Sequence, residues 1–409
     1  AMPLPRLLRR LLRLPWPCPC RGPDPCSPPL TPARRHGTQQ HRRQQPRPRA
    51  SFRCHPNRNI HMPPRRHDCH LRHHRNPRSF FRRCHHHRLV SAERLRRVVE
   101  RFPPHEFSCA YGSGVFSQAL TKAEEQNASR SRDLKMIDII IGVDDPVAWH
   151  NENIAQNPGD YNPALRAFGA DFVAGVQSCG GAHMLYFPYV NVGGEAQQIK
   201  YGVISTEHLE ADLEHWETLF CAGRLHKPVM VLNTTAEITE YIKANRRSAL
   251  ACAILLSLES DQGGHFTCRL SRHELFKGIA DISYLGDPRF LIRAEDSRKV
   301  EKIVSANSKE FAALYSPILD ELALELSLSS SSTTTSTPLP LLSATGVDIS
   351  LSSNEVSALT MILPSNILRM IPVNDTKPDS DRDLIQLHER LREGLKSIVK
   401  SAALFQNIK

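Results

Sequence analysis

The spacing of hydrophobic positions along this chain changes at about residue 236. Before that point, short apolar runs are separated by segments whose apolar residues recur every three or four positions. The apolar runs predict β-strands at 106–110, 135–143, 184–192 and 199–205. The other segments predict helices at 91–101, 117–125, 163–174 and 206–220. Strands interleaved with helices predict an α/β domain, which we place at 89–237.

After residue 236 the pattern becomes mostly helical. Apolar residues at helical spacing predict helices at 238–258, 273–280 and 297–324, with few strand signals between them. We therefore expect a second, helical domain at 238–325. Residues 326–356 are rich in Ser and Thr, and this composition predicts a disordered insertion.

The C-terminal segment, 357–409, is predicted to end in an amphipathic helix. One helical stripe carries its apolar residues, which are Leu384, Leu387, Leu391, Leu395, Ile398, Ala402 and Phe405. Arg390, Lys396 and Lys400 lie off this stripe. Such a helix can lie on an anionic membrane or dock on the protein's own core, and we favour docking. The segment stops at Lys409 and is predicted to be truncated.

Positive charge is concentrated near the N-terminus. The 409-residue chain has a formal net charge of +11, but residues 1–88 contain 21 Arg, no Lys and two acids, a net charge of +19. The rest of the chain is therefore mildly acidic, at −8. An Arg-rich, acid-poor leader is typical of a mitochondrial transit region, and its Pro content favours disorder. Dense Arg also attracts nucleic acid, but since the charge belongs to the leader, we expect no nucleic acid partner.

No apolar run reaches the roughly 18 residues that a membrane-spanning helix needs. The longest run, 249–258, is predicted to be a buried helix. We therefore expect a protein that is soluble or peripheral to a membrane.

Two features of the first domain point to phosphate chemistry. The turn Gly112-Ser113-Gly114 follows the first strand, and its amides and hydroxyl can wrap a polyphosphate. Asp138 is a single acid in the apolar strand 135–143, where a charge is costly unless it is paired or binds a metal. A nucleotidyltransferase combines such a turn with a strand carboxylate that holds Mg²⁺. The combination favours an enzyme over a binding module.

The metal site is incomplete in the sequence. Nucleotidyltransferases tend to carry two acids two residues apart, and the second position here is Ile140. Asp144 shares a strand face with Asp138, but six strand residues span roughly 20 Å. We interpret Asp144 and Asp145 as the turn that starts a helix at Pro146.

Basic residues in glycine-containing motifs are further candidates. Lys200 precedes Tyr-Gly-Val, and Arg224 and Lys227 lie in Ala-Gly-Arg-Leu-His-Lys-Pro-Val. Asp287 and Arg289 share a Gly-Asp-Pro-Arg motif. Lys and Arg beside Gly suit phosphate contacts, although each taken alone is as readily a surface charge.

Five motifs in this order carry a resemblance to a known family. They are Tyr-Gly-Ser-Gly-Val-Phe, Ile-Asp-Ile-Ile-Ile-Gly-Val, Lys-Tyr-Gly-Val-Ile-Ser, Ala-Gly-Arg-Leu-x-Lys-Pro-Val and Ser-Tyr-x-Gly-Asp-x-Arg. The chain resembles the mitochondrial phosphatidate cytidylyltransferases, also called mitochondrial translocator assembly and maintenance proteins, over about 89–325 and again near 400–409. It departs from the family pattern Asn-x-x-His-Tyr-Ser, because it reads Asn157-Pro-Gly-Asp160-Tyr161-Asn162.

The resemblance implies a fold and a reaction. The fold is an α/β nucleotidyltransferase-like domain followed by a helical winged-helix-like domain and a C-terminal helical segment. The reaction transfers CMP from CTP to phosphatidate with Mg²⁺, and gives CDP-diacylglycerol and pyrophosphate for cardiolipin and phosphatidylglycerol synthesis. The implied location is the matrix side of the mitochondrial inner membrane, with peripheral attachment to its lipid surface.

The resemblance also implies roles for individual residues. Asp138 would bind Mg²⁺, and Asp138, Ser113 and Lys200 would be catalytic. The residues that would bind CTP are Gly112, Ser113, Gly114, Lys200, Arg224 and Lys227, and Lys200 and Arg224 could contact the lipid phosphate instead. Two other interpretations stay open: a nucleotidyltransferase with a different acceptor, and a non-catalytic assembly factor for inner-membrane translocases.

Overall fold

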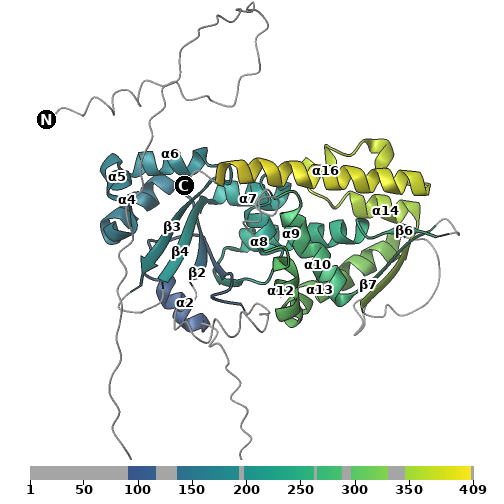
Figure 1. Ribbon diagram of the computed structural model, residues 1–409, viewed down its shortest axis with the longest axis horizontal. Coiled ribbons are helices and arrows are strands. Elements are labelled where there is room, and N and C mark those ends of the chain that lie inside the picture. The colour runs from purple at the N-terminus through teal and green to yellow at the C-terminus, as the bar shows by residue number, and fades with distance from the viewer. Residues whose placement is uncertain are drawn as a thin grey trace, which may run out of the picture. The chain divides into compact units, whose positions relative to one another are not determined.

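A mixed five-stranded sheet organises the N-terminal half of the folded region (Figure 1). The computed structural model describes residues 91–116, 136–192, 198–261, 265–287, 296–329 and 346–406. The strands are β1 (Phe107–Tyr111), β2 (Ile137–Val143), β3 (Met184–Asn191), β4 (Gln198–Ser205) and β5 (Met230–Asn233), in the order β3-β4-β2-β1-β5. Strands β2 and β4 are parallel, and the other neighbours are antiparallel. The four predicted strands are confirmed, and β5 was not predicted.

Helices follow the strands as the alternating pattern predicts. They are α2 (Ala92–Val99), α4 (Pro146–Gln156), η1 (Pro158–Asp160), α5 (Pro163–Phe168), α6 (Ala170–Cys179), α7 (Thr206–His215) and α8 (Cys221–Leu225). The side chain of Asp145 caps α4, which confirms the helix-start turn. The single helix predicted at 163–174 is wrong, because Gly169 has a φ of +84° and separates α5 from α6. The leader 1–88 and the helix predicted at 117–125 lie outside the described residues.

The two faces of this sheet pack into two different hydrophobic cores. Ile137, Ile139 and Ile141 point into one core, which contains side chains from α2, α4 and α6. Ile140 points into the other core, which contains side chains from α7, α8 and α9 (Ala236–Leu255). Successive strand residues face opposite sides, so Asp138 lies on the Ile140 side. The second core continues beyond the boundary predicted at residue 237.

The second region is helical, but it also contains a small sheet. Its main helices are α9, α10 (Arg272–Asp281), η2 (Ile282–Tyr284), α12 (Lys299–Ala306) and α13 (Ser308–Ser329). Three antiparallel strands, β6 (Glu259–Ser260), β7 (Phe266–Ser271) and β8 (Gly346–Leu351), pair in the order β6-β7-β8. These strands were not predicted.

The prediction of a disordered insertion at 326–356 is wrong for 326–329, which belong to α13, and for 346–356. Strand β8 pairs with β7 from Ser271 to Phe266, and α14 (Ser353–Thr360) begins with a capping box between Ser352 and Glu355. Buried Val347 and Leu351 attach β8 to the core. Serine and threonine suit strands and helix caps as well as disordered segments, so composition misassigned this stretch.

The C-terminal helix docks on the second region. The chain continues through α15 (Ser365–Leu368) and η3 (Val373–Thr376) to α16 (Asp381–Gln406), the yellow helix of Figure 1. The apolar stripe from Leu384 to Ile398 is buried, and the imidazole Nε2 of His388 lies 2.7 Å from the carbonyl oxygen of Leu255. Docking is therefore confirmed over this stretch. Among the described helices, none is long and apolar enough to cross a membrane.

Candidate active site

Strand pairing brings Asp138 and Lys200 together. The two residues are register partners in the parallel ladder between β2 and β4, so their side chains lie on the same face of the sheet. The ammonium nitrogen of Lys200 lies 3.7 Å from Oδ1 of Asp138. About a quarter of the Asp138 side chain is exposed (24%), so a ligand can reach this carboxylate.

The glycine turn lies directly beside the same carboxylate. Tyr111, the last residue of β1, pairs with Asp138, and Gly112 follows it with a φ of +81°. A Cβ atom at Gly112 would lie 2.6 Å from Oδ2 of Asp138. A Cβ atom at Gly114 would lie 2.5 Å from the carbonyl oxygen of Met136. Only glycine permits the conformation at position 112 and the close approach at both positions, so the turn that contains Ser113 lies against β2.

Arg224 joins the site from α8. The centre of its guanidinium group lies 4.8 Å from the centroid of the Tyr111 ring and 4.4 Å from that of Phe220. The Lys200 ammonium lies 4.3 Å from the centroid of the Tyr186 ring, and the Tyr111 and Tyr186 hydroxyl oxygens are 3.1 Å apart. Two cations near Asp138 thus lie on aromatic faces. Our sequence analysis missed these rings, because aromatic residues in apolar segments are ordinary core residues.

The charges around Asp138 are unbalanced. Burial raises the pKa of Asp138, and the positive charges of Lys200, Arg224 and Lys299 act against this rise. Lys299 belongs to α12, in the second region. The Nε atom of Arg224 is buried and has no hydrogen-bond partner among the described residues. One carboxylate among several cations fits a ligand that carries negative charge, such as a phosphate.

Lys227 is placed differently from the other predicted residues. Its ammonium group donates hydrogen bonds to the Gly223 carbonyl and, over 2.8 Å, to the Ser283 hydroxyl, and it lies 4.8 Å from the Tyr284 ring centroid. Burial lowers its pKa well below the ordinary lysine value. Lys227 therefore joins α8 to η2, and its contact with CTP stays a prediction.

The residues near Asp138 fit a metal ion that is shared with a substrate. Mg²⁺ in proteins is commonly held by one or two carboxylates plus substrate phosphates and water. Among the described residues, no group of three His, Cys, Asp or Glu side chains could hold a metal ion. Asp287 is buried, and Arg289 lies outside the described residues.

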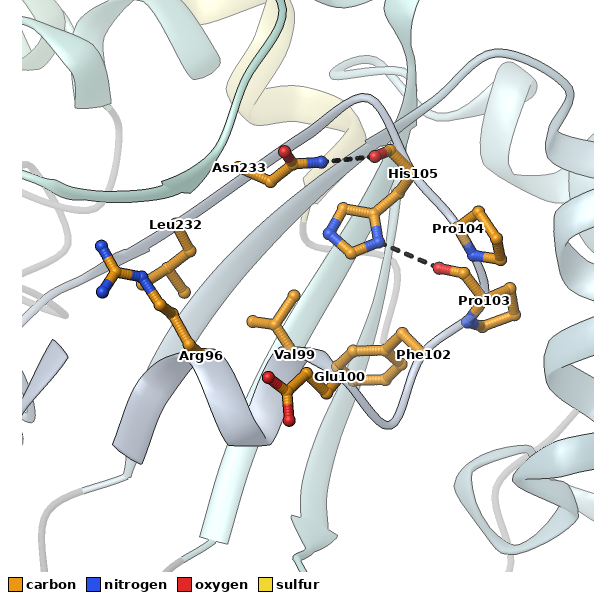
Figure 2. A pocket seen from close by; sticks show the side chains of 9 residues that line it. All are labelled: Arg96, Val99, Glu100, Phe102, Pro103, Pro104, His105, Leu232 and Asn233. Carbon is orange, nitrogen blue, oxygen red and sulfur yellow. Dashed lines mark hydrogen bonds between the residues drawn. The ribbon is translucent and has the colours of Figure 1, made fainter. Parts of the chain in front are cut away.

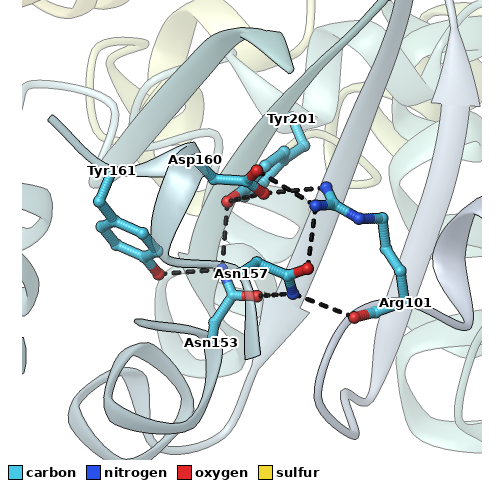
Figure 3. Close-up of polar contacts among 6 residues, drawn as sticks. All are labelled: Arg101, Asn153, Asn157, Asp160, Tyr161 and Tyr201. Carbon is cyan, nitrogen blue, oxygen red and sulfur yellow. Dashed lines mark hydrogen bonds and ion pairs between the residues drawn. The ribbon is translucent and has the colours of Figure 1, made fainter. Parts of the chain in front are cut away.

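The departure from the family pattern forms a closed polar network on the other face of the sheet (Figure 3). The Arg101 guanidinium donates to both carboxylate oxygens of Asp160, over 2.9 and 3.1 Å, and to the Asn157 side-chain carbonyl over 2.9 Å. The Tyr201 hydroxyl donates to Asp160 over 3.1 Å. Asp160 is therefore a partner of Arg101 in this chain.

A separate pocket of about 530 Å³ lies beside α2 and β5 (Figure 2). Its lining includes Arg96, Phe102, His105 and Leu232, and none of the predicted site residues. The His105 ring lies within hydrogen-bond distance of the Pro103 carbonyl and the Ser108 hydroxyl. The pocket is therefore distinct from the cluster around Asp138.

The fold and the cluster define a class of protein. A mixed sheet carries an acid on a central strand, a glycine turn beside that acid and basic side chains around it. This arrangement is what a nucleotidyltransferase needs to bind a metal–polyphosphate complex.

Comparisons with known proteins identify the family. A family model described as mitochondrial phosphatidate cytidylyltransferase matches residues 95–409. The phosphatidate cytidylyltransferase of Xenopus laevis is 34% identical over 328 residues, which cover 77% of this chain and 88% of that protein. The enzyme of Danio rerio is 34% identical over 334 residues, 78% and 89% of the two chains. The enzyme of Schizosaccharomyces pombe is 38% identical over 228 residues, which cover 56% of this chain and 53% of that protein. The chain belongs to the mitochondrial phosphatidate cytidylyltransferase family, and the suspected resemblance is confirmed.

Proposed function

We infer that this chain is a phosphatidate cytidylyltransferase. It transfers CMP from CTP to phosphatidate and forms CDP-diacylglycerol and pyrophosphate, for mitochondrial cardiolipin and phosphatidylglycerol synthesis. The observation that carries this function is the meeting of Gly112, Asp138, Lys200 and Arg224 at one place in a member of this family. Relatives from several organisms bear the name of this activity.

The residues around Asp138 perform this reaction by positioning and by charge. The phosphate oxygen of phosphatidate is anionic at neutral pH, so the attack on the α-phosphorus of CTP requires no strong general base. The amides of the turn Gly112-Ser113-Gly114 hold the polyphosphate, and Lys200 and Arg224 balance the charge of the two phosphate groups that meet. The Ser113 hydroxyl adds a further donor to the phosphates. We include Lys227 as a more distant basic residue of the same site.

Mg²⁺ is the metal that we propose for this site, with Asp138 as its protein ligand. A bound Mg²⁺ would neutralise charge on the leaving pyrophosphate. The exposed part of the Asp138 carboxylate supports this proposal, because a ligand can reach it. The Asp138 carboxylate lies between Gly112 and Lys200, and these two neighbours limit its orientation.

The location and the finer fold are also proposals. We propose peripheral attachment at the matrix side of the inner membrane, with 1–88 as the transit region, because the relatives are named mitochondrial and their acceptor is a lipid. We also propose that the second region is winged-helix-like, on the basis of its helices α9, α10 and α12 and the small sheet β6-β7-β8.

The direct test is synthesis of CDP-diacylglycerol by the purified chain. Labelled CTP, Mg²⁺ and vesicles containing phosphatidate should give CDP-diacylglycerol and pyrophosphate, and replacing Mg²⁺ by EDTA should stop the reaction. Diacylglycerol, a nucleic acid and a sugar phosphate serve as competing acceptors. Transfer to one of these in place of phosphatidate would contradict the proposed acceptor. A protein that binds vesicles but neither CTP nor Mg²⁺ would indicate an assembly factor.

A further inference from the structure

The loop that leads into α8 has an unusual backbone. Trp216 has a φ of +55° and Leu219 has a φ of +53°, and both residues are buried. Left-handed conformations are unfavourable for large side chains and persist only where the surrounding structure imposes them. This loop ends at Phe220, whose ring lies against the Arg224 guanidinium. The strained loop is therefore part of the wall of the active site.

Asp212 holds this loop in place. It lies in α7, is 2% exposed, and its carboxylate accepts four backbone hydrogen bonds of 2.8–2.9 Å. Oδ1 accepts from the amides of Thr218 and Leu219, and Oδ2 accepts from those of Cys221 and Ala222. The last two amides belong to the first turn of α8, which has few other acceptors available. One carboxylate thus fixes both the loop and the start of the helix.

The rest of α8 is held by residues of α9. The Asn245 side chain donates to the Ala222 carbonyl over 3.1 Å and accepts from the Trp216 indole over 2.8 Å. The Arg246 side chain donates to the Leu225 carbonyl over 3.1 Å, at the end of α8. A carboxylate at the first turn and a cation at the last turn also complement the helix dipole. The short α8 is therefore fixed at both ends.

We propose that Asp212 is a positioning residue for the transfer reaction, acting through Arg224. Arg224 lies two residues after the second amide pair that Asp212 binds, and its guanidinium reaches the Tyr111 ring next to Gly112. A five-residue helix cannot hold its own orientation, so the direction of Arg224 depends on the groups that hold its ends. This proposal rests on the proposed function, in which Arg224 contacts a substrate phosphate.

The test is a double-mutant cycle between Asp212→Asn and Arg224→Met. In Asp212→Asn, one oxygen becomes an NH₂ group that faces two backbone amides and cannot accept from them. We expect kcat/KM for CDP-diacylglycerol formation to fall roughly a hundredfold, the scale of a misplacement of about 1 Å. In the double variant it should fall no further than in Arg224→Met alone, because both changes remove the same contact.

A matched control separates positioning from general stability. Gln177 is 1% exposed and pairs with His150 in the other core, 2.9 Å away. Gln177→Leu should lower the melting temperature and leave kcat/KM unchanged, with or without Arg224. Additive losses for Asp212→Asn and Arg224→Met, or a folded Asp212→Asn with wild-type kcat/KM, would overturn the proposal.

A substitute variant and a second readout allow the proposal to be tested even if one variant does not fold or the acceptor is wrong. If Asp212→Asn does not fold, Arg246→Met takes its place in the cycle, because it frees the other end of α8. CTP affinity, measured by calorimetry on the same variants, provides a readout that does not depend on the acceptor. A wild-type protein that binds CTP but makes no CDP-diacylglycerol contradicts the proposed function alone. If the losses of CTP affinity in the two single variants add up in the double variant, only the positioning role of Asp212 is contradicted.

Discussion

Two groups of charged side chains, one on each face of the five-stranded sheet, differ in their balance of charge. On one face Arg101 and Asp160 form a two-pronged ion pair, surrounded by Asn157 and Tyr201 (Figure 3). On the other face the Asp138 carboxylate lies near two cations that rest on aromatic rings, Lys200 and Arg224. The first group is balanced in charge, and the second has an excess of positive charge.

This difference distinguishes a structural network from a candidate binding site. A buried ion pair whose hydrogen bonds are satisfied within the protein holds elements together and offers little to a ligand. The cations near Asp138 exceed its single negative charge, and such an excess attracts an anion. We therefore expect changes in the Arg101 group to alter stability, and changes in the Asp138 group to alter catalysis.

The largest expected effect is that of Asp138→Asn. Loss of the proposed metal ligand should lower kcat roughly a thousandfold, because metal stabilisation of the transferring phosphate amounts to several kcal/mol. The variant should stay folded, since Asp138 is partly exposed. Steady-state assays with CTP and phosphatidate, together with thermal melts, measure both quantities.

Asp160→Asn makes the same charge change on the other face and is the matched control. It should lower the free energy of unfolding by on the order of 2 kcal/mol, because it weakens a partly buried ion pair. The kcat/KM of the folded protein should stay unchanged. A loss of kcat/KM as large as that of Asp138→Asn would mean that both faces take part in catalysis.

The next effect is expected for Gly112→Ala. The added methyl group would lie 2.6 Å from the Asp138 carboxylate, in a backbone conformation that alanine rarely adopts. Displacement of that carboxylate should lower kcat/KM roughly a hundredfold. Gly159→Ala is the control, because nothing lies within 4 Å of a Cβ atom there. Equal activity of the two variants would show that the approach of Gly112 to Asp138 is unimportant.

A smaller effect concerns stability in acid. Burial lowers the pKa of His150 to about 4, and its ring lies against Gln177 and Tyr161. The unfolded chain, with an ordinary histidine pKa of 6.5, binds the proton first as the pH falls. The folded state therefore loses stability between pH 6.5 and 4, by about 2 kcal/mol at pH 5. Urea unfolding at pH 7 and pH 5 should show this loss, and His150→Gln should reduce it.

The smallest effect is a shift in the pH dependence of activity. Burial raises the pKa of Asp138, and the Lys200 charge holds it down. A carboxylate that binds Mg²⁺, as we propose for Asp138, must be ionised, so activity should fall at low pH. Lys200→Met should lower the rate, and in a pH–rate profile it should also move the fall in activity at low pH to higher pH. If this fall stays at the same pH, another group controls it.

Local patterns predicted most of the first region because they coincide with its packing. Strand β2 carries Ile137, Ile139 and Ile141 on one face and Ile140 on the other, and it is buried on both sides. An acid inside such a strand is conspicuous in the sequence, as is a Gly-Ser-Gly turn directly after a strand. The absence of a second acid at position 140 also has a structural reason. Ile140 fills the second core and is fully buried.

The missed features depend on partners that are distant along the chain. Strand β8 is stabilised by pairing with β7, about 80 residues earlier. Asp212 follows Leu209 at helical spacing on the buried face of α7. An acid at such a position is a signal that sequence analysis could have used, but the amides it binds become visible only when the loop after α7 is folded back.

By itself, the sequence determined the main strands and helices, the Gly-Ser-Gly turn, the acid within a strand, and the family. These depend on residues close in the chain or on motifs in a fixed order. Only the tertiary structure decided that Lys200 reaches the Asp138 carboxylate, that the Arg224 guanidinium lies on the Tyr111 ring beside it, that Lys227 binds η2, and that α16 docks. The physical reason is that register between β2 and β4 and the anchoring of α8 by Asp212 are interactions between separate segments. Local spacing carries no information about them until the chain has folded.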